Sequence, residues 1–263
     1  MDLQLKDRIV MVTGSGGGMG QQFARDFAAE GATVIVNDIN EQGIAQTVAQ
    51  IGDAGGRAVS APCDITALAA VTALVQRIEA QHGRLDILVN NAAVLVQHAL
   101  FLDTRPEDCA REMAVILHGT MNCARAALPG MVARRYGKIV NIVTDAARVG
   151  QEREVNYSAA KGGVVSFTKS IAREMGPHNI NVNAVSPAAT NSPMRQHALQ
   201  QMAEKIGTDK LQEREARVRR AYPLRRIGEP EDVSHTVLFL ASDVSRHITG
   251  QIVSVNGGYA MPG

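Results

Sequence analysis

A tyrosine and a lysine four residues apart could together carry acid–base chemistry. Tyr157 and Lys161 lie in the segment 155–175, whose spacing predicts a helix, and positions i and i+4 share one face of a helix. A free phenol has a pKa of about 10, and a nearby ammonium lowers it because positive charge favours the phenolate. We therefore expect Lys161 to lower the pKa of Tyr157, so that the phenol can exchange a proton with an alcohol or carbonyl oxygen. Thr144 ends a predicted strand upstream, and its hydroxyl could bind the same oxygen.

A glycine-dense turn near the N-terminus forms a second candidate site. The apolar run Ile9–Thr13 ends in the turn Gly14–Gly20, and a segment of helical periodicity follows. Strand, glycine turn and helix can hold a pyrophosphate, because glycine lets a ligand approach the backbone and the helix N-terminus offers free N–H groups. Asp38 ends the next strand, where a carboxylate can bind an adenosine ribose. An ordinary loop is the alternative, and the flanking strand, helix and acid favour a dinucleotide site.

Polar residues also follow two further predicted strands. Asp64 could accept a hydrogen bond from an adenine amino group or cap the next helix, and the two roles can coexist. The amides of Asn90 and Asn91 could tie neighbouring loops together and line the cofactor site, or belong to a turn that merely favours Asn. Ligands of parallel sheets bind beyond the carboxyl ends of the strands, which is where these residues lie.

The elements that must position these residues alternate between strand and helix. We expect strands at 9–13, 33–37, 58–61, 85–90, 138–143, 180–185 and 252–255, and helices at 18–30, 41–54, 68–82, 106–135 and 155–175. This alternation predicts a Rossmann-type, doubly wound parallel α/β sheet of about seven strands with helices on both faces. No linker or repeat divides residues 1–263, so we predict one domain. Residues 188–225 include one or two helices outside the sheet, which we expect to form a substrate lid.

The composition argues against several classes of function. The 263 residues carry a formal net charge of +1 and only 3% aromatic residues, which suggests neither a nucleic-acid nor a membrane partner. The three cysteines are odd in number and form no CxxC pair, as in a reducing compartment. The sequence shows no signal peptide and no apolar run long enough to cross a bilayer, so we expect a cytoplasmic protein. We expect no metal site.

Together, these motifs resemble the classical short-chain dehydrogenase/reductase family over essentially the full length of the chain. The matching positions are the glycine turn, Asp64, Asn90–Ala92, Tyr157 with Lys161, Asn183–Pro187, Pro223–Asp232 and Ile248–Gly258. The resemblance implies hydride transfer between a nicotinamide and a carbinol or carbonyl carbon, with Tyr157 as the general acid/base. Lys161 would lower the pKa of Tyr157 and bind the nicotinamide ribose, and Thr144 would replace the family's usual serine. The family is usually tetrameric, so a homotetramer is expected.

The resemblance also implies a set of cofactor-binding residues in the loops that follow the strands. They are Gly14, Ser15, Gly18, Met19, Gly20, Asp38, Ile39, Cys63, Asp64, Ile65, Asn91, Ala92, Ala93, Tyr157, Lys161, Pro187, Ala188, Thr190 and Ser192. A carboxylate at Asp38 would accept hydrogen bonds from the ribose and repel a 2′-phosphate. No Arg or Lys lies in the glycine turn or at 39–40 to bind that phosphate, so we predict NAD rather than NADP.

Three residues depart from the family's pattern. Ile116 stands where the usual catalytic Asn helps hold a water that passes protons to the lysine, and Ile has no polar group. His118 is close in sequence, but two positions along a helix point elsewhere. Ala93 and Ala188 replace usual glycines, and both are compatible with cofactor binding. The proton relay is the open question: either turnover is slower or the proton leaves by another route.

The substrate pocket is expected to form from loops around the nicotinamide. The candidate residues are Val94, Val96, Asp145, Arg148, Arg153, Ala189 and Met194. Arg148 and Arg153 could meet an anionic substrate or belong to a solvated surface. The stretch 145–150 is most similar to the subgroup that contains 2-hydroxycyclohexanecarboxyl-CoA dehydrogenase, which implies an alicyclic or acyl-CoA alcohol or ketone.

Three functions remain open from the sequence. The leading interpretation is an NAD-dependent secondary-alcohol dehydrogenase that also works as a ketone reductase. A 3-oxoacyl-thioester reductase is the second, and Asp38 counts against its NADPH-using form. A non-catalytic NAD-binding protein is the third. Ile116 suggests it, whereas the retained Thr144, Tyr157 and Lys161 argue against it.

Overall fold

Apolar residues with alternating directions build the sheet at the centre of the fold. In strand β1 (Ile9–Thr13), Val10 and Val12 pack on one layer of helices, whereas Ile9 and Met11 pack on the other. Every residue of this strand is buried, as expected for a parallel sheet covered on both faces. The structure is a computed structural model that describes residues 2–262, without the side chains of residues 193, 194, 197, 198 and 201.

Seven parallel strands form the sheet in the order β3-β2-β1-β4-β5-β6-β7. The remaining strands are β2 (Thr33–Asp38), β3 (Arg57–Pro62), β4 (Ile87–Asn90), β5 (Gly137–Ile142), β6 (Ile180–Pro187) and β7 (Ile252–Val255). The strand order reverses between β1 and β4, which makes this the topological switch point where a doubly wound fold binds its ligand. The predicted Rossmann-type sheet is confirmed.

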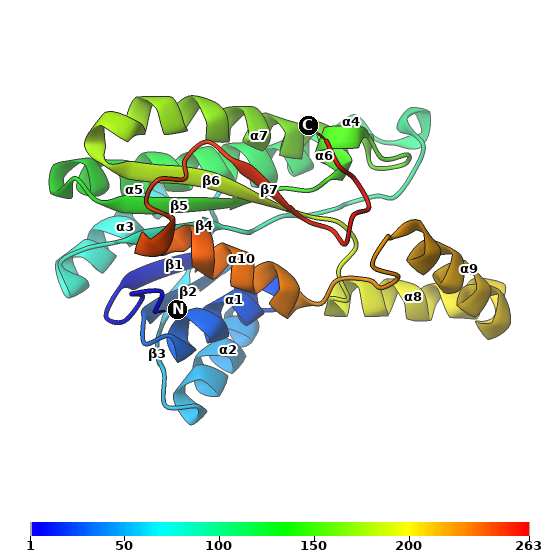
Figure 1. Ribbon diagram of the computed structural model, residues 1–263, viewed down its shortest axis with the longest axis horizontal. Coiled ribbons are helices and arrows are strands. Elements are labelled where there is room, and N and C mark those ends of the chain that lie inside the picture. Colours follow the sequence, from blue (N-terminus) through cyan, green and yellow to red (C-terminus); the bar gives the residue numbers. More distant parts are fainter. Residues whose placement is uncertain (1, 263) are drawn as a thin grey trace.

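Helices cover both faces of the sheet (Figure 1). One layer contains α1 (Gly18–Ala29), α2 (Glu41–Asp53) and α10 (Pro230–Ala241), and the other contains α3 (Leu68–His82), α5 (Gly119–Arg134) and α7 (Val155–Met175). Short elements connect them: η1 (Phe101–Asp103), α4 (Pro106–Glu112), η2 (Met113–His118), α6 (Ala146–Val149), η3 (Gly176–His178) and η4 (Asp243–Ser245). No helix in the part of the chain described here is long and apolar enough to span a membrane.

The helix predicted at 106–135 is wrong in one respect, because it is divided into three parts. A π-helical turn, η2, separates α4 from α5, and single π turns of this kind often occur at functional sites. Ile116 lies in that turn and is fully buried against Val143, Ala160 and Val164. Helix α10 was not predicted either, although its capping box of Glu229 with Asp232 is a recognisable start signal.

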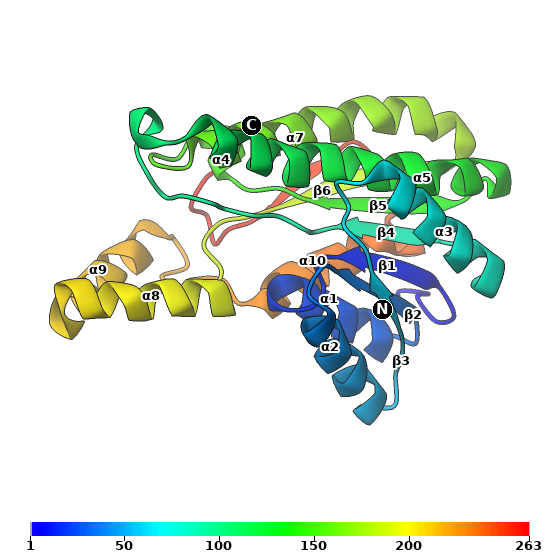
Figure 2. The same ribbon diagram turned by 180° about the vertical axis from the view of Figure 1, so that it is seen from behind.

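Two helices extend away from the sheet, as the predicted lid requires. Helices α8 (Pro193–Ile206) and α9 (Thr208–Ala221) project to one side of the body in both views (Figures 1 and 2). Gly207 joins them with φ +86°, and Arg195 pairs with Glu215 at 2.6 Å, so the pair is held mainly by its own contacts.

Helix α1 approaches the end of β1 so closely that residue 20 has no room for a side chain. A Cβ at Gly20 would lie 2.2 Å from the carbonyl oxygen of Gly14 and 2.5 Å from Nδ2 of Asn91. A Cβ at Gly17, in the same turn, would meet nothing within 4 Å. The glycine at position 20 is therefore a packing requirement of the turn.

We predict that Gly20→Ala destabilises the protein and that Gly17→Ala does not. The methyl group at position 20 must push α1 away from the turn, at a cost of about 1–3 kcal/mol or more. Urea unfolding of both variants beside the unmodified protein measures the difference. If both variants unfold at the same midpoint, the close approach at Gly20 does not constrain the fold.

Candidate active site

The ends of β1 and β4 are joined by a network of hydrogen bonds at the switch point. The side chain of Asn91 donates to the carbonyl oxygens of Thr13 and Gly14, both at 3.0 Å. The hydroxyl of Thr13 accepts from the backbone N–H groups of Asn91 at 3.0 Å and Ala92 at 3.1 Å. Asn91 thus ties the two loops together, as one of the two sequence interpretations predicted. Asn90 instead points into the sheet, where it donates to Asn141 at 2.8 Å.

Asp38 lies directly against the glycine turn. One carboxylate oxygen accepts from the N–H of Gly16 at 2.9 Å, and the other accepts from the N–H of Asn40 at 3.0 Å. The first turn of α1 has no side-chain cap, and a Cβ at Gly17 or Gly18 would meet no atom within 4 Å. The N-terminus of α1 therefore opens onto space beside a carboxylate, which fits the pyrophosphate and ribose of a dinucleotide.

The other predicted cofactor residues surround the same edge of the sheet with different exposures. Ile39 is 73% exposed beside Asp38, whereas Ser15, Ile65 and Pro187 are buried. The carboxylate of Asp64 is exposed and accepts from the N–H and hydroxyl of Thr66, each at 2.8 Å, so it shapes the turn before α3. Gly14, Gly18, Met19, Cys63, Ala92, Ala188, Thr190 and Ser192 are partly or largely buried, and Ala93 is exposed.

Tyr157 and Lys161 lie one turn apart on α7, next to the end of β5. Lys161 is 3% exposed, and its Nζ donates to the carbonyl oxygen of Ile142 at 2.6 Å. Nζ also lies 5.8 Å from the centroid of the Tyr157 ring. Thr144 follows β5, and its hydroxyl accepts from the N–H of Ala146 at 3.3 Å. The structure thus brings the predicted phenol and ammonium together at the strand end that Thr144 follows.

The expectation that Lys161 lowers the pKa of Tyr157 is wrong for this geometry. Burial raises the pKa of Tyr157 well above its ordinary range, and the negative charges of Glu154 and Glu112 raise it further. Burial also lowers the pKa of Lys161 to about 7, so its positive charge is partly lost near neutral pH. Nζ of Lys161 lies against the ring of Tyr157 and the backbone carbonyl of Ile142. These two contacts stabilise the phenolate less than a hydrogen bond to the phenol oxygen would.

Two predicted substrate residues bind the C-terminal segment instead. Asp145 is 1% exposed and accepts from Ser186 at 2.6 Å, Ser254 at 3.2 Å and the side-chain amide of Asn256. Arg148 donates to Ser254 at 2.6 Å and to the carbonyl oxygen of Pro262 at 3.3 Å. Their charged groups hold the chain end in place, so this structure does not support the predicted substrate contacts. The surrounding helix, α6, was too short to recognise from periodicity.

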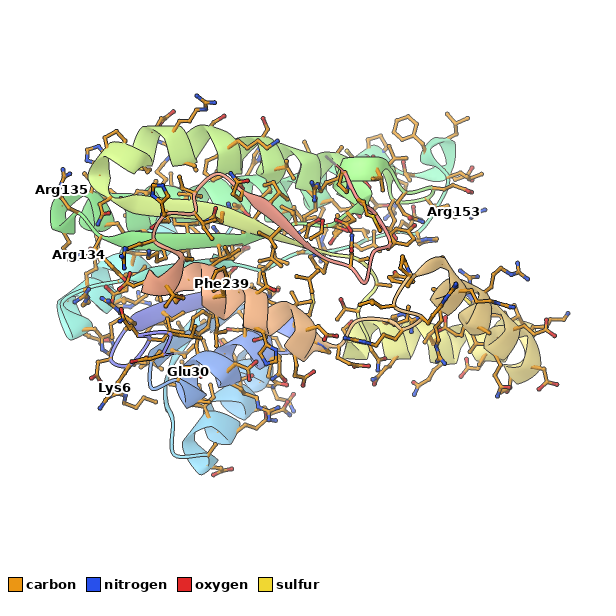
Figure 3. The ribbon with its side chains drawn as sticks, in the orientation of Figure 1. Lys6, Glu30, Arg134, Arg135, Arg153 and Phe239 are labelled. Atoms are coloured by element: carbon orange, nitrogen blue, oxygen red, sulfur yellow. The ribbon has the colours of Figure 1, made fainter. Side chains whose placement is uncertain are left out.

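The remaining predicted substrate residues differ in where they lie. Arg153 points outward at the edge of the molecule, 3.4 Å from Glu152, which matches the solvated-surface alternative (Figure 3). Val94 and Val96 are partly buried, and Ala189 donates its N–H to the hydroxyl of Tyr222 at 3.2 Å. The side chain of Met194 lies outside the described residues. Over the part that is described, no His, Cys, Asp and Glu residues gather as a metal site.

Two acidic residues near Tyr157 were not predicted from the sequence. Glu112 lies at the end of α4 and is 3% exposed; Glu154 immediately precedes α7 and its side chain is 22% exposed. Glu112 lies one helical turn before Ile116, and Glu154 lies one turn before Tyr157. That spacing was the available signal, since residues three or four apart share a helix face.

The buried lysine predicts a pH dependence of stability. The pKa of Lys161 is about 7 in the folded protein, against about 10.4 in an unfolded chain. Between these values the unfolded chain binds more protons, so the free energy of unfolding rises with pH. From about pH 7 to about pH 9 this residue should add about 2 kcal/mol, a rise that Lys161→Met lacks.

Urea unfolding across that pH range measures this difference. Lys169→Met is the matched control, because Lys169 is exposed on the same helix. A gap between the unmodified protein and Lys161→Met that stays constant with pH would contradict the lowered pKa.

The sequence matches one family profile over nearly its whole length. The family described as "Enoyl-(Acyl carrier protein) reductase" matches residues 14–260. A solved structure, "Crystal structure of gox2181", superposes with a TM-score of 0.88 at 28% identity, covering 98% of this chain and 97% of that one.

Curated relatives match over similar lengths. "Short-chain reductase protein NovJ" of Streptomyces niveus is 38% identical, over 96% of this chain and 94% of the relative. "(2S)-[(R)-hydroxy(phenyl)methyl]succinyl-CoA dehydrogenase subunit BbsD" of Thauera aromatica is 36% identical over 98% of both chains. "3-oxoacyl-[acyl-carrier-protein] reductase FabG" of Thermotoga maritima is 34% identical, over 97% of this chain and 99% of the relative. The chain therefore belongs to the short-chain dehydrogenase/reductase family, whose members are oxidoreductases that use a nicotinamide cofactor.

Proposed function

We propose that this protein is an NAD-dependent oxidoreductase that interconverts a secondary alcohol and a ketone. The observation that carries the proposal is the placement of Tyr157 and Lys161 on one face of α7, at the strand end followed by Thr144. Family membership supports the general reaction at a CH–OH group. The choice of NAD rests on Asp38.

The residues at the switch point fit this cofactor. The open N-terminus of α1 would hold the pyrophosphate, because its N–H groups lack a side-chain cap. Asp38 would accept hydrogen bonds from the adenosine ribose and would repel a 2′-phosphate. Lys161 would bind the nicotinamide ribose after exchanging the carbonyl oxygen of Ile142 for a ribose hydroxyl. When bound, NAD supplies the acceptor for the hydride that leaves the carbinol carbon.

The chain's own residues then handle the proton. In the direction of oxidation, Tyr157 as its phenolate would accept the hydroxyl proton of the alcohol while the hydride leaves the carbinol carbon, and a ketone results. In the reverse direction Tyr157 donates that proton to the carbonyl oxygen. Thr144 holds this oxygen through its hydroxyl. The raised pKa of Tyr157 keeps its phenol protonated over most of the pH range, a state suited to ketone reduction.

Two alternatives have specific support. Reduction of a 3-oxoacyl thioester is supported by the relatives whose names specify acyl-carrier-protein or CoA substrates. A non-catalytic NAD-binding role is suggested by the fully buried Ile116, which brings no polar group to the π turn. We also propose that the chain belongs to the subgroup that contains 2-hydroxycyclohexanecarboxyl-CoA dehydrogenase. Its substrate would then be an alicyclic or acyl-CoA compound.

We also propose that the chain forms one domain and that residues 188–225 act as its substrate lid. We further propose that the protein assembles as a homotetramer. Leu224 is 65% exposed and Met261 is 79% exposed, so apolar side chains lie uncovered next to the C-terminal strand. Burying such residues between copies of the chain would favour association.

We predict that Tyr157→Phe abolishes nearly all turnover and retains NAD binding. Phenylalanine keeps the ring and removes only the hydroxyl that exchanges the proton, so the rate should fall at least 100-fold, on the order of a lost general acid. Tyr136→Phe is the matched control, since its hydroxyl bonds Asp243 at the opposite end of β5. The measurement is NADH oxidation with cyclic ketones, aryl ketones and 3-oxoacyl thioesters. A near-normal rate for Tyr157→Phe would remove Tyr157 as the acid/base.

We predict that Asp38→Ala shifts binding from NAD towards NADP. Removing the carboxylate deletes an acceptor for the ribose and the repulsion of a 2′-phosphate, so the ratio of NADH to NADPH affinity should fall about tenfold, equivalent to about 1.4 kcal/mol. Fluorescence titrations with NADH and NADPH measure this ratio. Asp53→Ala, at the exposed end of α2, should leave it unchanged. An unchanged ratio in Asp38→Ala would refute the ribose argument.

A further inference from the structure

A side chain of helix α5 holds the turn that follows strand β3. Nδ2 of Asn122 donates to the carbonyl oxygens of Ile65 at 3.0 Å and Thr66 at 3.1 Å. These carbonyls precede helix α3, and in the described part of the chain no backbone N–H bonds either of them. Gly119, one turn earlier on α5, packs against Ile65, since a Cβ there would lie 2.6 Å from Cδ1 of that side chain. Helix α5 therefore fixes this turn by its backbone and by a side chain.

The same turn is joined to Asp38 on its other side. The N–H of Cys63 donates to the carbonyl oxygen of Asp38 at 3.1 Å. The side chain of Asn37 donates to the carbonyl oxygens of Ala61 at 2.9 Å and Cys63 at 3.1 Å. Asp38 is the residue proposed to bind the adenosine ribose, and β3 is the strand that flanks β2 at the edge of the sheet. The base attached to that ribose would therefore lie beside the turn 63–66.

The carboxylate of Asp64 is the group of this turn that can recognise the base. Asp64 is exposed, and its Oδ1 accepts from both the N–H and the hydroxyl of Thr66. Among the described residues no donor is bonded to Oδ2. A carboxylate accepts from the amino group of adenine, whereas it cannot bond the carbonyl oxygen of a deaminated base, which also only accepts. The direction of this carboxylate depends on the backbone of Thr66, which Asn122 holds.

We propose that Asn122 is a positioning residue for the adenine end of the cofactor. By fixing the carbonyls of Ile65 and Thr66, it keeps the carboxylate of Asp64 directed so that it can accept a hydrogen bond from the adenine amino group. This inference rests on the proposed NAD-dependent function and deepens it, because it names the residue on which the selection of adenine depends. Asn122 acts only through the turn, so its replacement should weaken cofactor binding and leave the proton transfer at Tyr157 unchanged.

Two reduced cofactors that differ at one group of the base test this selection. Reduced nicotinamide hypoxanthine dinucleotide carries a carbonyl oxygen where NADH carries the adenine amino group. In fluorescence titrations the unmodified protein should bind NADH at least about tenfold more tightly, the value of one hydrogen bond to a charged group. Asn122→Ala, which suits a helix, should reduce this preference to about twofold or less. Asn122→Asp should do the same, because it keeps the shape but sets a carboxylate against two carbonyl oxygens. With a ketone that the unmodified protein reduces, the KM for NADH should rise and kcat should not change.

Arg134→Met is the matched control, because it removes a different contact of the same helix. Arg134 donates to the carbonyl oxygen of Leu85 at 2.9 Å and pairs with Glu79 of α3 at 2.8 Å, so it joins α5 to the opposite end of α3. Its replacement should lower stability and keep the preference for NADH.

Three results would overturn the inference while NADH still binds. They are equal affinities of the unmodified protein for the two cofactors, a preference that persists in both Asn122 variants, and a preference that Arg134→Met loses to the same extent. If the unmodified protein does not bind NADH, the proposed function fails and this inference fails with it.

Discussion

The parallel direction of all seven strands is the constraint on which the rest of this structure depends. It gathers every strand's carboxyl end at one edge, so residues distant in sequence, such as Gly14, Asn91 and Thr144, come to one place. Buried polar groups at that edge also need hydrogen-bond partners. Asn91 supplies them between β1 and β4, and Asp145 supplies them between β6 and the C-terminal segment. Helix α1 can approach the first of these ties only because residue 20 is glycine.

Burial of Lys161 carries an energetic cost at this edge. Its Nζ donates to a backbone carbonyl, which stabilises the ammonium less than a carboxylate would, and burial lowers its pKa to about 7. The protein thus keeps a group that destabilises the fold near neutral pH. The neighbouring Ile116 has the opposite character, because it contributes apolar packing where a polar relay residue is expected. Helix α7 therefore packs against the apolar side chain of Ile116 and also carries the buried ammonium of Lys161, whose desolvation costs free energy.

Most of the fold could be predicted from the sequence because its signals are local and repeated. Helices α3 and α7 match the predicted bounds, since each has a continuous apolar face and a clear end. The π turn around Ile116 could not be predicted, because it arises from the packing of η2 on α7 and has no residue pattern of its own. The residues of the candidate site also fall into two groups, those that motif spacing predicts and those that depend on distant contacts. Motif spacing located Tyr157, Lys161 and Asp38, whereas Asp145 and Arg148 bond to C-terminal residues more than a hundred positions away. The pKa of a phenol also depends on its burial, which motif spacing does not reveal. For this reason the sequence predicted a lowered pKa for Tyr157, whereas burial raises it.

The protonation state of Tyr157 connects these observations. A raised pKa at Tyr157 would hinder alcohol oxidation, because the phenolate that accepts the proton is scarce. Burial is the largest cause of that shift, and the charges of Glu154 and Glu112 add to it. The packing that shields the phenol from water therefore also keeps it protonated, and a protonated phenol is ready to donate to a carbonyl oxygen. The same burial thus favours ketone reduction over alcohol oxidation at this site.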